Sequence, residues 1–153
     1  MLTLGQLMVL TQPAKSKWTK SYRLEYFKAA PAEDNSGSYF AFSAVVAGGK
    51  EPRKSYMKLY SDEIEAGAPV SVSCTCTYFR IKLAIPLAVN GSTEVNVRRS
   101  DIPDKYRGIQ APGLCPHLLL LSETILSQNN TEVERLRNAS KRTNINAKLK
   151  SMT

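Results

Sequence analysis

Apolar and polar residues alternate in several short stretches along the first hundred residues of the chain. This pattern is typical of β-strands that bury one face. It predicts strands at residues 22–26, 39–47, 55–60, 70–74 and 93–97. The cluster of Pro, Asp, Asn, Ser and Gly residues at 29–37 predicts a turn, so the first two strands are expected to form a hairpin.

The pattern between and after these strands is less regular. Residues 62–68 are polar and predict a turn, and residues 99–114 carry the prolines and glycines of a long loop. Residues 78–90 fit either a strand or a helix, with Pro86 arguing against a long helix.

A helix is predicted from Pro116, because proline suits the first turn of a helix, where its missing N–H costs nothing. The apolar residues that then share one helical face are Leu118, Leu121, Ile125 and Leu126. The polar residues 129–131 end this helix and offer a cap for a second, basic helix at about 132–142.

The composition is that of one globular domain with a real core. Hydrophobic residues make up 42% and charged residues 22% of the 153 residues, which argues against global disorder. The apolar runs fall far short of the about 20 residues that cross a bilayer, so no membrane span is predicted. The apolar N-terminal stretch has no basic region before it and no A-x-A-like cleavage site after it. The chain is therefore expected to be intracellular and unprocessed.

The formal net charge of +8 is concentrated toward the two ends of the chain. Residues 1–30 hold five Lys and Arg residues against one acid, and residues 131–153 hold six against two. Basic ends of this kind contact nucleic acid or an acidic protein face, or serve only as a solvated surface.

Every cysteine and the only histidine belong to one of two closely spaced pairs. Cys74 and Cys76 form the first pair, and Cys115 and His117 form the second, 38 residues later. Thiolates and imidazole are the ligands of tetrahedral zinc sites, so the pairs predict one zinc ion held by all four residues. Four protein ligands leave no open position for water, which predicts a structural zinc rather than a catalytic one.

Each of these residues alone has a simpler interpretation. Buried cysteines are often inert, and His117 also suits the start of a helix. Three cysteines cannot all form disulfides within one chain, and few disulfides are expected in an intracellular protein. The presence of all four residues in two matched pairs favours the metal site.

The C-x-C…C-x-H order, with a strand leading into the first pair and a helix following the second, resembles the SWIM zinc-finger family. The segments that carry the resemblance, within about 70–121, are Val72-Ser-Cys-Thr-Cys-Thr-Tyr-Phe-Arg, Gly91-Ser and Ala111-Pro-Gly-Leu-Cys-Pro-His-Leu-Leu. They are similar to SWIM-like sequences in structural proteins of tailed bacteriophages. The resemblance implies that Cys74, Cys76, Cys115 and His117 are the zinc ligands.

The sequence departs from the family pattern at three points. Thr77 stands where proline is usual, Pro116 stands where lysine is usual, and the insert between the two pairs is longer than in ordinary SWIM domains. The absence of that lysine beside His117 weakens the nucleic-acid role that the family has in cells.

Together these features predict an α+β fold. A small antiparallel sheet is linked by zinc to a C-terminal helix, and extended arms leave the body at both ends. The expected divisions are an N-terminal arm or short first element at 1–20, a β-rich domain with the SWIM-like finger at 21–128, and a basic C-terminal helix or tail at 129–153.

The predicted function is non-catalytic. The only histidine is assigned to the metal, which leaves no Ser-His or Cys-His nucleophile, and no glycine-rich phosphate loop is present. The resemblance implies a structural protein of a phage particle, in the tail, baseplate or neck, that binds other virion proteins in a multi-copy assembly. The implied location is the virion, and the host cytoplasm before assembly, with no membrane and no small-molecule substrate.

The alternative is a zinc-finger protein that binds nucleic acid, or acts as a regulator, through its basic ends. Tyr56, Tyr60 and Tyr78, with Lys and Arg residues nearby, also fit a stacking surface for single strands. Aromatic residues that alternate along strands more often pack in the core.

Overall fold

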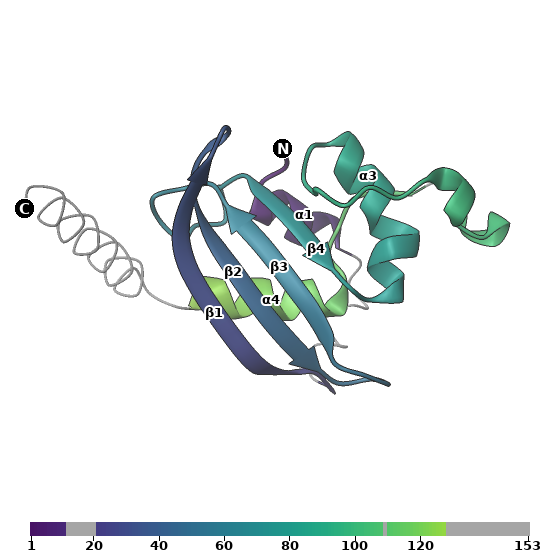
Figure 1. The fold of residues 1–153 in the computed structure, drawn as a ribbon, viewed down its shortest axis with the longest axis horizontal. Helices are drawn as coiled ribbons and strands as arrows, with labels where there is room; N and C mark the ends of the chain where they lie inside the picture. The colour runs from purple at the N-terminus through teal and green to yellow at the C-terminus, as the bar shows by residue number, and fades with distance from the viewer. Residues whose placement is uncertain (12–20, 109, 128–153) are drawn as a thin grey trace, which may run out of the picture.

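A four-stranded antiparallel sheet forms the body of the protein in a computed structural model, which describes residues 1–11, 21–108 and 110–127. The strands follow one another in space as they do in sequence (Figure 1). They are β1 (Arg23–Asp34), β2 (Gly37–Ala47), β3 (Arg53–Leu59) and β4 (Val70–Cys74). With the helices around it, this sheet confirms the predicted α+β class.

One face of the sheet is buried beneath helix α4 (Pro116–Ser127), which crosses behind the strands in Figure 1. The buried face follows the strict alternation of the sequence, since Phe40, Phe42, Ala44 and Val46 of β2 all point toward the core. Helix α4 packs against the sheet with its predicted apolar face, of which Leu118, Leu121 and Ile125 are fully buried. Burial of these side chains is the main force that holds the helix against the sheet.

The predicted hairpin of β1 and β2 is confirmed, but its turn is shorter than expected. Strand β1 continues through Pro31 as far as Asp34, and β2 begins at Gly37, whose φ of +123° suits a glycine. Proline is tolerated within β1 because this strand lies at the edge of the sheet and pairs only with β2. The turn-forming residues at 29–33 therefore belong to a strand.

The structure decides between helix and strand at residues 78–90 and differs from the prediction at residues 93–97. Residues 78–90 are helical, with a π-helical turn (Phe79–Leu83) that leads into α3 (Ala84–Val89), where Pro86 lies in the first turn. The strand predicted at 93–97 is wrong, because these residues are extended without pairing in the sheet. The 99–114 loop is confirmed and contains two short 3₁₀ turns, Arg99–Asp101 and Asp104–Tyr106.

Among the described residues no helix has the length and apolar character needed to cross a bilayer.

The N-terminal residues form part of the folded body rather than an extended arm. Helix α1 (Leu4–Leu10) begins with a capping box in which Thr3 and Gln6 bind each other's backbone N–H groups. Leu4 and Leu7 are fully buried in the core, and the backbone N–H of Leu4 donates to the carbonyl of Ala68. Residues 4–10 are therefore the short first element, and the expectation of an extended arm is wrong for these residues. Residues 12–20 lie outside the described part of the chain, as does the whole basic segment predicted at 129–153.

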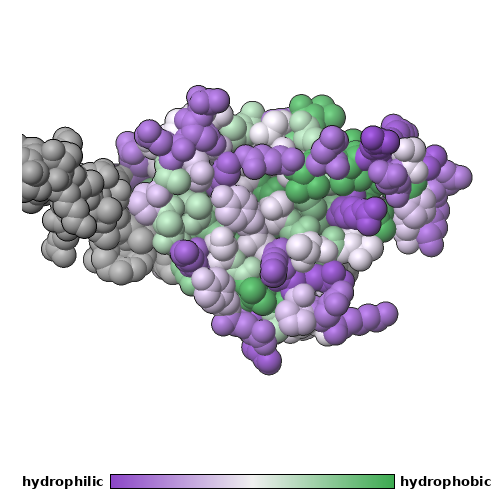
Figure 2. Space-filling model, viewed as in Figure 1, coloured by the Kyte–Doolittle hydropathy of each residue, from purple (hydrophilic) through white to green (hydrophobic). Residues whose placement is uncertain are grey.

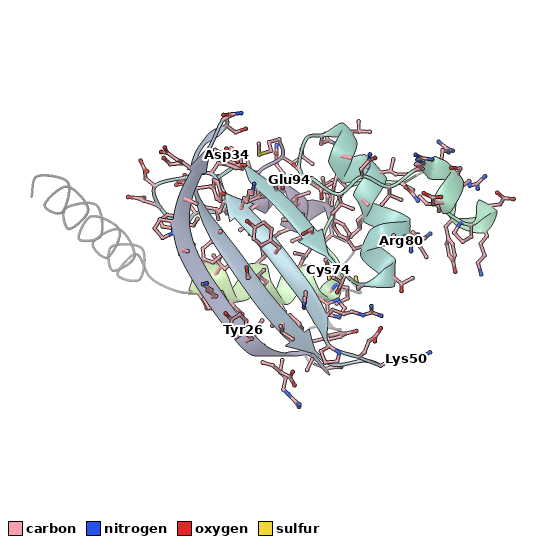
Figure 3. All side chains as sticks on the ribbon, in the orientation of Figure 1. Tyr26, Asp34, Lys50, Cys74, Arg80 and Glu94 are labelled. Atoms are coloured by element: carbon pink, nitrogen blue, oxygen red, sulfur yellow. The ribbon has the colours of Figure 1, made fainter. Side chains whose placement is uncertain are left out.

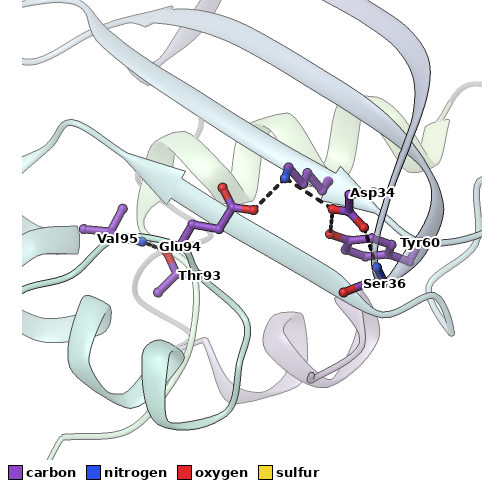
Figure 4. A network of polar contacts seen from close by, with 7 residues as sticks. Asp34, Ser36, Tyr60, Thr93, Glu94 and Val95 are labelled. Atoms are coloured by element: carbon purple, nitrogen blue, oxygen red, sulfur yellow. Dashed lines mark hydrogen bonds and ion pairs between the residues drawn. The ribbon is translucent and has the colours of Figure 1, made fainter.

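A polar cluster ties the extended segment at 93–97 to the sheet (Figure 4). Lys58 of β3 forms ion pairs with Asp34 and Glu94, and the hydroxyl of Tyr60 donates to the Asp34 carboxylate at 2.7 Å. Burial and this bond to Asp34 raise the pKa of Tyr60 to about 12. The apolar residues of the segment, Val95 and Val97, pack against the core, which explains the alternation that resembled a strand.

Helix α1 provides a test of how much the N-terminal residues contribute to stability. We expect Leu7→Ala to lower the free energy of unfolding by about 2–5 kcal/mol, because it leaves a cavity in the core. Val9→Ala, at a position that is 85% exposed on the same helix, is the matched control and should change it by less than about 0.5 kcal/mol. Urea titration measures both. Equal, small effects would mean that α1 is not part of the cooperative core.

Candidate metal centre

The two predicted ligand pairs meet where the sheet and helix α4 come together (Figure 3). Cys74 is the last residue of β4, and Cys76 follows in the turn that leads into the π-helical segment. Cys115 immediately precedes α4, and His117 lies in its first turn. One donor atom from each of the four residues lies within 4.8 Å of all the others. The structure therefore brings together every site residue that the sequence predicts.

The donor set fits a tetrahedral metal ion. Zinc bonds of about 2.0–2.3 Å place four ligand atoms roughly 3.5–4 Å apart, so only a small contraction of this cluster is needed. All four residues are buried, and Cys115 is completely so. The Nδ1 atom of His117 is a buried polar atom with no hydrogen-bond partner among the described residues. Because buried polar atoms are rarely left unpaired, this nitrogen is the one that a metal would engage. The cluster is compatible with a metal ion such as zinc.

Two of the sulfur atoms cap turns of the backbone. The Sγ of Cys76 accepts the N–H of Phe79 at 3.3 Å, and the Sγ of Cys115 accepts the N–H of Leu118 at 3.4 Å. In both cases the donor lies three residues later, the geometry of a helix N-cap. Cys115 thus lies at the positive end of the α4 dipole, where a negatively charged thiolate is stabilised. The same bonds that start α4 also orient a ligand.

A second layer of contacts comes from β3 and from the residue before β1. The hydroxyl of Ser55 donates to the Sγ of Cys74 at 3.5 Å, and the two residues are paired across β3 and β4. The ring of Tyr22 meets the imidazole of His117 edge-on, with centroids 4.8 Å apart. Groups that hold the ligands in place commonly affect metal affinity almost as strongly as the ligands do.

The thiols influence one another strongly when no cation separates them. Hydrogen bonds from the Cys115 and Cys76 thiols lower the pKa of Cys74, so this sulfur is the one that ionises first. Burial and the neighbouring Cys74 and Cys76 sulfurs raise the pKa of Cys115 well above its usual value. Ionisation of Cys115 beside these sulfurs is therefore unfavourable in this site on its own. A divalent cation removes the conflict, because a coordinating thiol is deprotonated outright.

Three residues of the site could not be selected from sequence patterns. They are Tyr22, Gly48 and Ser55. Gly48 has φ of +125°, and a Cβ atom there would lie 2.5 Å from the Tyr22 ring. Tyr22 lies 95 residues before His117 in sequence, so no local spacing connects the two. Their roles depend on the way the sheet folds over the start of α4.

Comparison of the chain with protein-family models, with curated proteins and with solved structures found no match. The resemblance to SWIM-like sequences therefore stays a prediction from the motif. The argument for a metal rests on the arrangement of the four donors.

A pair of glycine substitutions tests the contact between Tyr22 and His117. Gly37 and Gly48 have nearly the same φ, so Gly37→Ala and Gly48→Ala should each cost about 1–3 kcal/mol in backbone strain. Only Gly48→Ala also displaces Tyr22, because the added Cβ atom would overlap its ring. A Cβ atom at Gly37 would have no other atom within 4 Å. We expect Gly48→Ala to weaken metal binding by about 10-fold or more, and Gly37→Ala to leave it unchanged. Competition with a chromogenic zinc chelator measures both, and equal affinities would show that Tyr22 does not support the site.

Proposed function

We propose that the chain binds one structural zinc ion through Cys74, Cys76, Cys115 and His117, and that this ion fastens the sheet to helix α4. The observation that carries the proposal is the convergence of four buried donors, with the unpartnered Nδ1 of His117 among them. Three sulfurs and one nitrogen form a common ligand set of structural zinc sites. The ion joins two segments that lie 38 residues apart.

The proposed role of the ion is structural because the protein supplies all four ligands of a tetrahedral site. A catalytic zinc keeps a position for water or substrate, and here such a position would require one of the buried ligands to leave. The chain has a single histidine, and this proposal assigns it to the metal. The protein then acts through what its surfaces bind rather than through a reaction at the zinc.

The assembly that we propose for this binding role is a phage particle, in which the protein contacts neighbouring subunits of the tail, baseplate or neck. The support is the similarity of residues 70–121 to SWIM-like sequences of phage structural proteins. The backbone hydrogen bonds between residues 2–5 and residues 66–70 are consistent with a rigid subunit, because the N–H of Val70 donates to the carbonyl of Leu2 and covers the edge of the sheet there.

Zinc binding is tested by metal analysis of the purified protein and its variants. We expect one zinc per wild-type chain by mass spectrometry, and none after Cys115→Ser or His117→Ala. Each variant should lose about 4 kcal/mol or more of unfolding free energy, because the buried donors lose their cation. Thr77→Ala, at an exposed position beside the ligands, is the control and should keep both zinc and stability. Wild-type stability in the ligand variants would contradict a structural role for the metal.

Membership of a phage particle is tested separately. Mass spectrometry of particles purified from the natural source should detect the chain in several copies per particle, and Cys115→Ser should prevent its incorporation. Its absence from intact particles, with the wild-type protein remaining free in the lysate, would overturn this part of the proposal and leave the zinc site unaffected.

A further inference from the structure

The open face of the sheet carries a groove that borders the candidate metal centre, since Cys74 and Ser55 are among the residues that line it. This face points away from α4 and toward the viewer in Figure 2, where many weakly coloured side chains lie over the sheet and purple, hydrophilic ones lie around them. The groove has a volume of about 420 Å³, within the ~300–1,000 Å³ range of ligand clefts. Its floor includes Ser43 and Val45 of β2, and its walls include Tyr26 of β1 and Tyr56 of β3.

The strand register sets tyrosine and lysine residues on both sides of the groove, with Lys54 among its lining residues and Lys28 on β1 beside it. Tyr26 is paired with Val45, which is paired with Lys54, so an aromatic ring and an ammonium group face each other across β2. In the next row Lys28 is paired with Ser43, which is paired with Tyr56. The tyrosine lies on β1 in the first row and on β3 in the second, and the lysine lies on the opposite strand each time. Strands β1 and β3 therefore each present one tyrosine and one lysine. All of these side chains lie on the open face because their neighbours along each strand point into the core.

The described residues do not neutralise the positive charge beside the groove. Lys28 and Lys54 are exposed, and neither forms an ion pair within the part of the chain that the structure describes. Lys58, the third lysine of this face, is paired with both Asp34 and Glu94 at the other end of the sheet. At one end of the open face the charge of Lys58 is neutralised by ion pairs, and at the other end Lys28 and Lys54 remain positively charged. The groove lies at this positively charged end.

We propose that this groove binds single-stranded nucleic acid, with bases stacked on Tyr26 and Tyr56 and phosphates beside Lys28 and Lys54. Tyr26 is 52% exposed, so its ring is accessible to a base. Bases stack on aromatic side chains with little regard to sequence, and flanking lysines follow the phosphates of the backbone. The hydroxyl groups of Ser43 and Ser73 are suited to polar contacts with a base or sugar.

An unpaired strand fits these features better than a duplex or an acidic peptide. The bases of a duplex are stacked on one another and cannot cover the two rings. An acidic peptide would satisfy the lysines but has no flat rings to cover the tyrosines. The proposed binding does not involve the zinc ion itself, so its failure would leave the metal proposal intact.

The test uses the full-length, zinc-loaded protein and fluorescein-labelled dT12 and U12, with binding measured by anisotropy. We expect Tyr26→Ala and Tyr56→Ala each to raise Kd by about 10-fold, and Tyr26→Phe to retain binding because it keeps the ring. Lys28→Gln with Lys54→Gln should reduce the slope of log K against log salt by roughly 1.4, or about 0.7 per lysine. The two oligonucleotides separate a preference for DNA from one for RNA, and either preference supports the proposal.

Tyr106 provides a matched control for the tyrosine variants. It is half-buried on a loop outside the groove, with Lys82 and Lys105 each 4.8 Å from its ring, so it combines the same residue types at another place. Tyr106→Ala should leave Kd unchanged. Zinc content and circular dichroism confirm that each variant is folded, and mass spectrometry of a strand photo-crosslinked through 4-thiouridine locates the contact in the wild-type protein.

Four results would overturn the proposal. They are the absence of oligonucleotide binding to the wild type, equal binding by wild type and both tyrosine-to-alanine variants, crosslinks that map only outside the groove, and displacement of the strand by polyglutamate as efficiently as by unlabelled dT12. The last result would indicate that the groove binds an acidic protein surface instead.

Discussion

The meeting of three sulfurs and one imidazole nitrogen at a single buried point is the constraint on which the fold depends. Hydrophobic contacts hold α4 against the sheet but are not directional, and the helix begins with four consecutive leucines after His117. Such a helix has several ways to bury apolar surface. A metal ion shared by the four residues would permit only one, because Cys115 and His117 would then have to reach Cys74 and Cys76 at the end of β4. The proposed metal would thus select the position of the helix, whereas the core supplies most of the attraction.

The hydrogen bonds around the sulfur atoms also suit a bound zinc ion. Zinc with three thiolates carries a net charge of −1, which would be unfavourable in a dry interior without donors around it. The backbone N–H groups of Phe79 and Leu118 and the hydroxyl of Ser55 all point at sulfur, so the excess negative charge is spread over hydrogen bonds. Two of these donors belong to the first turns of helical segments. The local structure that positions the ligands is therefore also the structure that stabilises their charge.

Local sequence patterns were sufficient for the features that depend on neighbouring residues. The hairpin, β3, β4 and α4 follow from periodicity and turn residues, and the ligand pairs follow from spacing alone. The pattern failed at 93–97, because alternation reports burial of one side of a segment and not pairing with another strand. The core position of α1 depends on contacts with residues near Ala68, and the approach of Tyr22 to His117 spans 95 residues. Neither contact leaves a signal in short-range spacing.

The two edges of the sheet are protected in different ways, and this difference restricts where partners can bind. Residues 2–4 and Ser92 cover the outer edge of β4 through backbone hydrogen bonds. Strand β1 has no such cover among the described residues, but it contains Pro31 and several charged residues, which disfavour the addition of a further strand. A partner that extends the sheet is therefore disfavoured at both edges. The open face then remains as the largest surface of the sheet, and the neutralisation of Lys58 by Asp34 and Glu94 directs an anionic partner toward its other end.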